Sequence, residues 1–143
     1  MLTFELVTLE GVKYSEDCHE VIFPTPEGQI AIFPNHMPLI SVISPGVISI
    51  RKREKDADDR MQLFATDGGI LEISKNHRLR LLADVAEEAE DVNELEAKEA
   101  LKRAQELRAN ADSQVDLAEA TAIIAQQSAR LRVAELKRRK RQY

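Results

Sequence analysis

The sequence predicts an α+β protein with a β-rich head over residues 1–84 and a pair of helices over residues 85–143. In the first part apolar residues recur at every second position, which is the period of a half-buried strand. Past residue 91 the apolar spacing lengthens to the period of a helix. The apolar residues with this spacing are Val92, Leu95, Leu101, Ala104 and Leu107. The acidic stretch 85–91 between the two patterns suits either an unpacked hinge or an ordinary solvated linker, because it is charged and soluble.

The head begins with three short predicted strands. Alternating apolar residues at 2–7 indicate a first strand with one face in the core. Two further extended segments are expected at 12–14 and 19–23. A polar turn at 15–17 separates them, because serine and aspartate favour turns.

Proline and glycine mark the turns in the rest of the head. Residues 24–28 form a turn, since proline fixes φ and glycine accepts a positive φ. Two prolines exclude both a helix and a central strand at 34–38, so this segment is a shaped loop. The charged run 51–60 has nothing to bury and reads as an exposed hairpin tip. Further strands are expected at 29–33, 39–43, 47–50, 61–65, 70–73 and 79–82.

Eight or more short strands at close spacing predict a β-sandwich or a small barrel. The chain has no tryptophan and few other aromatic residues, so valine, isoleucine and leucine must fill most of the core. One cysteine, Cys18, cannot form an internal disulfide, which indicates a reducing compartment. We expect Cys18 to be a small buried residue.

The first helix is expected to begin at a capping box. Asp91 with Glu94, or Asn93 with Glu96, has the spacing that this motif requires. The helical pattern runs to about Ala109.

The second helix is expected to begin at Ser113, after a break at 110–112, and to reach toward Lys140. So short a link predicts an antiparallel hairpin. One face of this helix carries Leu117, Ala120, Ile124, Leu131 and Ala134. Because alanine buries far less apolar area than leucine, the hairpin is either a detachable arm held by few strong contacts or simply a closely packed helix pair.

Charge is distributed unevenly along the chain, although the net charge is −5. Residues 85–129 hold 4 basic and 11 acidic residues, which gives −7. Residues 130–143 hold 7 basic residues and one acidic residue, which gives +6. The basic tip can therefore attract an acidic partner, either a protein or a nucleic acid.

Several classes of protein are disfavoured by the sequence. The N-terminus has no basic lead followed by a long apolar core, so no signal peptide is expected. No apolar run approaches the roughly 20 residues that span a bilayer. Gly68-Gly69 lacks the lysine of a phosphate loop, and the three histidines, His19, His36 and His77, lack metal-ligand spacing. No nucleophile lies beside a base in a local motif, so the pattern favours a binding or mechanical protein over an enzyme.

Residues 28–39, GQIAIFPNHMPL, resemble the signature of the epsilon subunit of F-type ATP synthases, G-x-L-G-I-x-P-x-H-x-P-L. Ile30 and Ala31 depart from it conservatively. Other segments match in kind and order, at 45–46, 68–72, 82–84 and 129–133. The resemblance covers nearly the whole chain, and the order of a β-rich head followed by a helix pair agrees with it.

The resemblance implies a non-catalytic rotor subunit that serves proton-driven ATP synthesis. Its head is a ten-stranded β-sandwich held between the central gamma stalk and the ring of c subunits. The residues that match the contact segment are Gln29, His36, Met37, Pro38 and Leu39. Some relatives carry an acid where Gln29 lies, and this chain departs from them there. His36 either contacts a partner or braces the loop by a hydrogen bond.

The resemblance further implies that the helix hairpin lies folded on the head or extends along gamma to the catalytic alpha and beta subunits, where it blocks ATP hydrolysis. The cations suited to that contact are Arg130, Arg132, Lys137, Arg138, Arg139, Lys140 and Arg141. Apolar area is supplied by Ile124, Leu131, Val133 and Leu136. The sequence does not choose between the two positions.

The resemblance also bears on cofactors and location. Some relatives bind ATP through an aspartate and an arginine near the first helix start, where this chain has Asn93 and Glu96. Because Glu96 repels phosphate, we expect no cofactor and weak or absent ATP binding. The implied location is the cytoplasmic face of the bacterial cell membrane, as a peripheral protein, in preference to a plastid thylakoid.

Two other functions fit parts of the sequence. A small nucleic-acid-binding module could use the basic tip, although no aromatic residue interleaves the cations from Arg130 to Arg141 and the rest of the chain is acidic. A coiled-coil adaptor unrelated to ATP synthase is the third reading.

Overall fold

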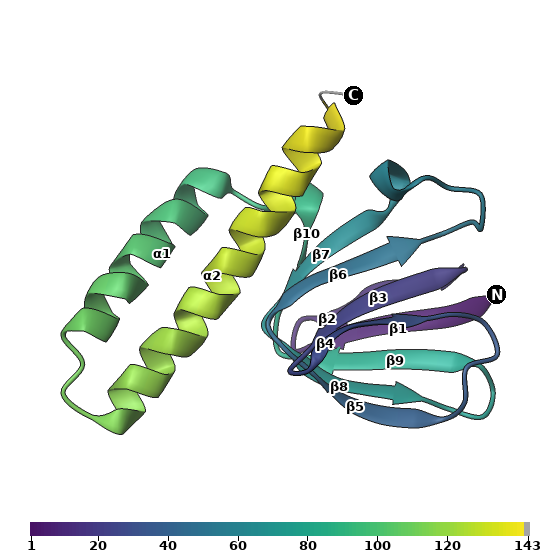
Figure 1. Ribbon diagram of the computed structural model, residues 1–143, viewed down its shortest axis with the longest axis horizontal. Helices are drawn as coiled ribbons and strands as arrows, with labels where there is room; N and C mark the ends of the chain where they lie inside the picture. Colours follow the sequence, from purple (N-terminus) through teal and green to yellow (C-terminus); the bar gives the residue numbers. More distant parts are fainter. Residues whose placement is uncertain (142–143) are drawn as a thin grey trace.

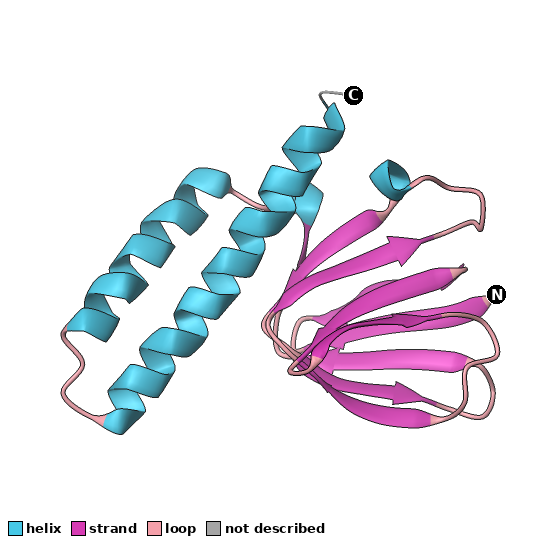
Figure 2. Cartoon of the chain, in the orientation of Figure 1, coloured by secondary structure: helices cyan, strands magenta, loops and turns pink. Residues whose placement is uncertain are grey.

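The computed structural model describes residues 1–141, without the side chains of residues 140 and 141. Within this part of the chain, ten strands form two stacked sheets, and two long helices follow, of which the second packs on one sheet and the first packs on the second helix (Figure 1, Figure 2). The strands are β1 Leu2–Thr8, β2 Gly11–Cys18, β3 Glu20–Thr25, β4 Gly28–Ile32, β5 Leu39–Ile43, β6 Gly46–Arg51, β7 Gln62–Thr66, β8 Gly69–Ile73, β9 Arg78–Ala83 and β10 Ala86–Glu88. The helices are η1 Asp58–Arg60, η2 Ala89–Asp91, α1 Glu94–Ala109 and α2 Gln114–Arg141.

The two sheets have five strands each. Sheet A has the order β2-β1-β9-β8-β5, and sheet B has the order β10-β7-β6-β3-β4. The strand pairs within residues 1–141 are antiparallel except β1 and β9, which run parallel although most of the head separates them in sequence. This arrangement confirms the ten-stranded sandwich and rules out the small barrel.

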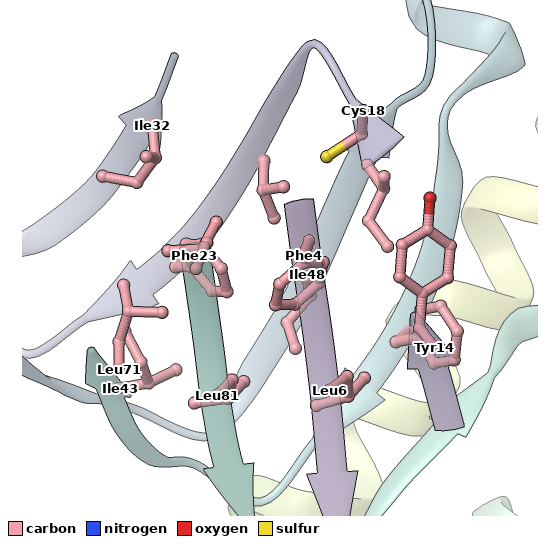
Figure 3. Close-up of a cluster of buried hydrophobic side chains, with 14 of the residues drawn as sticks. Phe4, Leu6, Tyr14, Cys18, Phe23, Ile32, Ile43, Ile48, Leu71 and Leu81 are labelled. Atoms are coloured by element: carbon pink, nitrogen blue, oxygen red, sulfur yellow. The ribbon is translucent and has the colours of Figure 1, made fainter. Parts of the chain in front are cut away.

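The core lies between the sheets and is built from the inward positions of both (Figure 3). The alternation predicted for β1 is confirmed, because Leu2, Phe4 and Leu6 are buried. The ring of Phe4 meets that of Phe23 edge-on with centroids 5.6 Å apart, and it contacts Tyr14 at the same distance. Aromatic pairs at this distance add to the stabilisation from burial.

Cys18 is buried in the same cluster. Burial raises the pKa of its thiol to about 12, because the thiolate would lose its hydration. The thiol is therefore protonated and unreactive at neutral pH. The interpretation of Cys18 as a small core residue is confirmed.

The polar turn predicted at 15–17 is wrong. These residues continue β2, where Ser15 pairs with Glu5 and Asp17 pairs with Thr3. Thr3 Oγ1 also donates to Asp17 Oδ1 at 2.8 Å. Because β2 is the edge strand of sheet A, it tolerates polar side chains, and pairing with β1 overrides their preference for a turn.

Strand β7 is buried on both faces. Phe64 points into the sandwich core, whereas Leu63 and Ala65 lie on the outer face of sheet B beneath α2. This second apolar cluster contains Met61, Leu63, Ala65, Ala89, Ala129 and Val133, with Ile22, Val47, Val92 and Leu136 packed against it. The α2 members all lie at or beyond Ala129, so only the C-terminal half of α2 contributes to the cluster, and the rest of the hairpin projects away from the sandwich (Figure 1).

The acidic junction is packed, so the expectation of an unpacked hinge is wrong for residues 86–89. Ala86 pairs with Thr66 of β7, and Ala86 and Ala89 are both buried. This last strand lies beyond the boundary expected at residue 84. The small alanines permit close approach to sheet B while Glu87 and Glu88 stay half-exposed between them.

The helix boundaries follow the predicted caps. Of the two possible cap positions the second is used: the Asn93 side chain accepts a hydrogen bond from the Glu96 amide at 3.0 Å. Ser113 Oγ accepts from the Asp116 amide at 3.1 Å and begins α2. Helix α1 ends at Ala109, as predicted.

The two helices form the predicted hairpin, packed through small residues. The fully buried alanines at this contact include Ala97, Ala104 and Ala120. The predicted α2 face is only partly right, because Ala120 and Ala134 are buried but Leu117 is exposed near the tip of the hairpin. Among the described residues no helix is long and apolar enough to cross a bilayer.

Candidate functional site

The loop between β4 and β5 carries most of the predicted contact residues. His36 Nδ1 donates to the backbone carbonyl of Met37 at 2.7 Å, which is a hydrogen bond of the kind that the loop-bracing role requires. Asn35 has a φ of 67° and turns the chain there. The side chain of Met37 is 72 % exposed, and Pro38 and Leu39 are also exposed. The loop therefore presents an uncovered apolar tip, at the end of the sandwich remote from the hairpin (Figure 1).

Gln29 lies apart from this loop. It is the second residue of β4, where it pairs with Pro24 and is exposed on the edge of sheet B. The loop follows the other end of β4. The structure thus brings His36, Met37, Pro38 and Leu39 together and leaves Gln29 on a different part of the surface.

A larger apolar surface, which the sequence reasoning missed, crosses the outer face of sheet A. We call it the apolar stripe. Its members are Val42, Ile70, Leu82, Val7 and Val12, one from each strand. Each is the register partner of the next, so all five point to the same face. Ile70, Leu82, Val42 and Val12 are at least 47 % exposed, and within residues 1–141 no helix covers them (Figure 1).

Consecutive apolar residues were the signal for this stripe. In a sandwich one face of each strand is in the core, so neighbours such as Val42-Ile43, Ile70-Leu71 and Leu81-Leu82 must place one apolar side chain outside. Contiguous exposed apolar surface of this kind marks an interaction site.

Gly69 keeps the two central strands of the stripe together. A Cβ at this position would lie 2.1 Å from the carbonyl oxygen of Leu82. Any side chain here would push β8 away from β9 and separate Ile70 from Leu82. This close approach gives a physical reason for glycine at this position of the motif 68–72.

The predicted arm cations fall into three groups. Arg130, Lys137 and Arg138 bond across to acids of β10, η2 and α1. Arg132 and Arg139 both pair along α2 with Glu135. The side chains of Lys140 and Arg141 lie outside the described residues.

Asn93 and Glu96, which align with the ATP-binding pair of some relatives, make other contacts in this structure. The Asn93 side chain caps α1, and Glu96 Oε1 lies 4.0 Å from Arg130 Nη1. The adjacent cleft, lined in part by Thr66, Glu87 and Arg130, holds about 10 Å³, which is hardly one water molecule. This cleft beside Arg130 is thus too small for a nucleotide.

We therefore predict that ATP titrated into the isolated chain gives a dissociation constant weaker than about 1 mM by calorimetry. The double variant Asn93→Asp, Glu96→Arg restores the residue types of the relatives that bind ATP and is expected to bind more tightly. A micromolar constant for the unaltered chain would contradict this prediction.

Within the described residues no group of three or more histidine, cysteine, aspartate and glutamate side chains could hold a metal ion. The surfaces that the chain offers are the loop tip, the apolar stripe and the charged arm. They suit contacts with other proteins.

Comparison with known proteins gives the family. The model of the ATP synthase delta/epsilon chain β-sandwich domain matches residues 1–89. The ATP synthase epsilon chain of Herpetosiphon aurantiacus is 34 % identical over 137 residues, which cover 96 % of each chain. ATP synthase epsilon chain 2 of Ralstonia nicotianae is 36 % identical over 141 residues, covering 99 % of this chain and 98 % of the relative.

Solved structures show the same fold at low identity. A chain of the Euglena gracilis mitochondrial ATP synthase aligns with a TM-score of 0.77 over 94 % of this chain and 81 % of that one, at 12 % identity. A chain from the central stalk and c-ring structure of the Tetrahymena thermophila mitochondrial enzyme aligns with a TM-score of 0.57 over 95 % of this chain and 96 % of that one, at 14 % identity.

The two-part fold, the signature loop and these relatives agree. The chain belongs to the ATP synthase epsilon chain family, the non-catalytic central-stalk subunits of F-type ATP synthases that serve ATP synthesis and proton transport.

Proposed function

We propose that the head of this chain couples the gamma stalk to the c-ring and that the hairpin is an arm that inhibits ATP hydrolysis when it extends to the catalytic alpha and beta subunits. The proposed place is the cytoplasmic face of the bacterial cell membrane, where the protein is peripheral. One observation carries the proposal: α2 packs on part of the outer face of sheet B, whereas the apolar stripe on sheet A is uncovered.

The head offers two separate surfaces, as a coupling between two partners requires. We assign the stripe to gamma, because a broad apolar sheet face suits packing against a helical shaft. We assign the tip of the loop to the c-ring, because Met37 and Pro38 project from one end of the sandwich. Gln29 has no charge, so any contact it makes with the ring is polar and not ionic.

The arm is suited to leave the head. In the second apolar cluster α2 contributes two buried side chains, Ala129 and Val133, with Leu136 half-buried beside them. A partner that binds the extended arm must supply about 5.5 kcal/mol of differential affinity to move a 99:1 folded population to 1:99. On extension, the side chains that leave the head and contact the catalytic subunits would be Val133, Leu136 and the neighbouring cations.

Removing residues 91–143 tests this division of labour. The truncated head is expected to bind gamma and the c-ring and to support coupled ATP synthesis, while ATP hydrolysis by the reconstituted enzyme rises severalfold because the inhibitory arm is gone. The reference is the enzyme reconstituted with the full chain, and circular dichroism checks that the head is folded. Loss of gamma binding on truncation would show that the arm is part of the binding surface and would overturn the proposal.

The nucleic-acid-binding alternative is weakened by the arm's own contacts. The five arm cations with described side chains each pair with a carboxylate. A gel-shift at physiological salt discriminates, since only the alternative requires binding there. The adaptor unrelated to ATP synthase is excluded by family membership.

A further inference from the structure

Three cations of α2 face acids at the base of the hairpin, two in the segment that joins it to the head and one in the first turn of α1. Arg130 Nε lies 2.7 Å from Glu87 Oε2 in β10. Lys137 Nζ lies 2.9 Å from Glu90 Oε2 in η2. Arg138 Nη2 lies 3.1 Å from Glu94 Oε1 at the first turn of α1. Two complementary charged rows thus run along the C-terminal half of α2, beside its apolar contact with sheet B.

The Arg130 pair is the strongest of the three by its geometry. The side chains of Arg130 and Glu87 are only 12 % and 25 % exposed. A second guanidinium nitrogen donates to Glu87 at 3.5 Å, and a third donates to Gln127 Oε1 at 2.8 Å. Exposed ion pairs contribute little to stability, but breaking a mostly buried pair is costly because it leaves one charge without a partner.

We propose that Glu87 and Glu90 form an acidic latch that holds the arm folded on the head by binding two of its cations, Arg130 and Lys137. The pair of Glu94 with Arg138 lies within the hairpin and keeps the end of α2 beside the start of α1. On the α2 side the apolar contact beside the latch is made by only three side chains, Ala129, Val133 and Leu136, so it leaves the folded position sensitive to these pairs. The latch itself is a property of the isolated chain. Its regulatory consequence rests on the proposed inhibitory function of the arm.

The latch makes the two positions of the arm mutually exclusive. While α2 lies on sheet B, the Arg130 side chain is held beside Glu87 and is only 12 % exposed, so it cannot reach an acid of a catalytic subunit. Extension must therefore break the pairs to Glu87 and Glu90 first, and conditions that screen these pairs favour extension. The acidic junction has a net charge opposite to that of the basic tip. It therefore competes with the catalytic subunits for the cations of the arm.

Pulsed electron paramagnetic resonance on the full chain tests the latch. Spin labels at Lys75→Cys in the β8–β9 turn and Asp112→Cys at the hairpin tip report the distance between head and arm, and native Cys18 stays unlabelled because it is buried. Glu87→Gln and Arg130→Gln are each expected to raise the ratio of extended to folded arm about tenfold, and together no more than either alone. The matched control is Arg132→Gln, which removes an exposed cation paired along α2 and is expected to leave the ratio unchanged.

The same spin labels allow a second measurement, in which the distance between head and arm is followed as the salt concentration rises. Raising sodium chloride is expected to increase the extended fraction of the unaltered chain and to have a much smaller effect on Glu87→Gln. Where the extended fraction of the unaltered chain is too small to measure, the ratios are compared at the urea midpoint of arm release. The proposal is overturned if Glu87→Gln leaves the ratio unchanged or if Arg132→Gln shifts it equally, since the apolar cluster alone would then hold the arm.

The test separates the latch from the proposed function. One outcome is that Glu87→Gln shifts the distance between the spin labels while removing residues 91–143 leaves ATP hydrolysis unchanged. This outcome supports the latch and contradicts the inhibitory arm. An unshifted distance, with increased hydrolysis on truncation, contradicts the latch and supports the inhibitory arm.

Discussion

Replacing Ile70 and Leu82 together with aspartate is expected to weaken binding of the chain to an epsilon-depleted complex of gamma with the catalytic subunits by at least about a hundredfold. Burying one such apolar side chain contributes roughly 1.5 to 3 kcal/mol, and a carboxylate in its place must also lose its hydration. Both residues lie in the centre of the stripe, on neighbouring strands. Titration calorimetry or surface plasmon resonance on the reconstituted complex measures the change.

The control for this variant makes the same chemical change elsewhere. Leu107→Asp with Val115→Asp replaces two exposed apolar residues of the hairpin and is expected to leave the affinity within about twofold, because exposed positions away from an interface contribute little. Ile70 and Leu82 are about half-exposed, so the head should tolerate aspartate there, and thermal melting checks this. Unchanged affinity of the stripe variant, with an intact head, would mean that gamma binds another face.

Replacing Val133 with aspartate is expected to release the arm from the head. Val133 is fully buried in the second apolar cluster, between Ala129 and Leu136 on the helix and against the outer face of sheet B. Losing a buried valine costs about 2 kcal/mol, and an unpaired buried carboxylate adds several more. The folded position, which rests on few strong contacts, should not survive this change.

Limited digestion with trypsin measures the release of the arm from the head. In the unaltered chain the Arg130 side chain is largely buried in its pair with Glu87, whereas release of the arm exposes Arg130 to cleavage. The expected result is at least tenfold faster cleavage within α2 and an unchanged head fragment. Val115→Asp, on the same helix but exposed, serves as the matched control and should cleave at the unaltered rate. Protection of Val133→Asp equal to that of the control would show that the arm is held by other contacts.

Local signals in the sequence predicted most of the elements. The alternation in β1, the proline and glycine turn before β4, the Asn93 cap and the end of α1 at Ala109 all depend on residues close together in the chain. The errors arose where a distant segment changed the outcome. Pairing with β1 made the polar residues 15–17 part of a strand. Pairing with β7 of sheet B made residues 86–88 a strand, β10.

The candidate site was predicted only in part for the same reason. The loop His36 to Leu39 could be located from its prolines and its resemblance to the family, and it is exposed. The apolar stripe required the order of the strands in sheet A, because its five members come from five separate segments. The partners of Arg130, Lys137 and Arg138 likewise depended on where α2 lies on the head.

The sequence by itself determined that a β-rich head precedes a helical hairpin, where the helices begin, and that the basic tip follows an acidic root. Periodicity, caps and charge are properties of neighbouring residues, so they can be read along the chain. Only the tertiary structure decided which sheet face the arm covers, which apolar face stays open, and which acids hold the arm's cations. Those choices depend on side chains brought together from distant segments, where burial and ion pairing act through space.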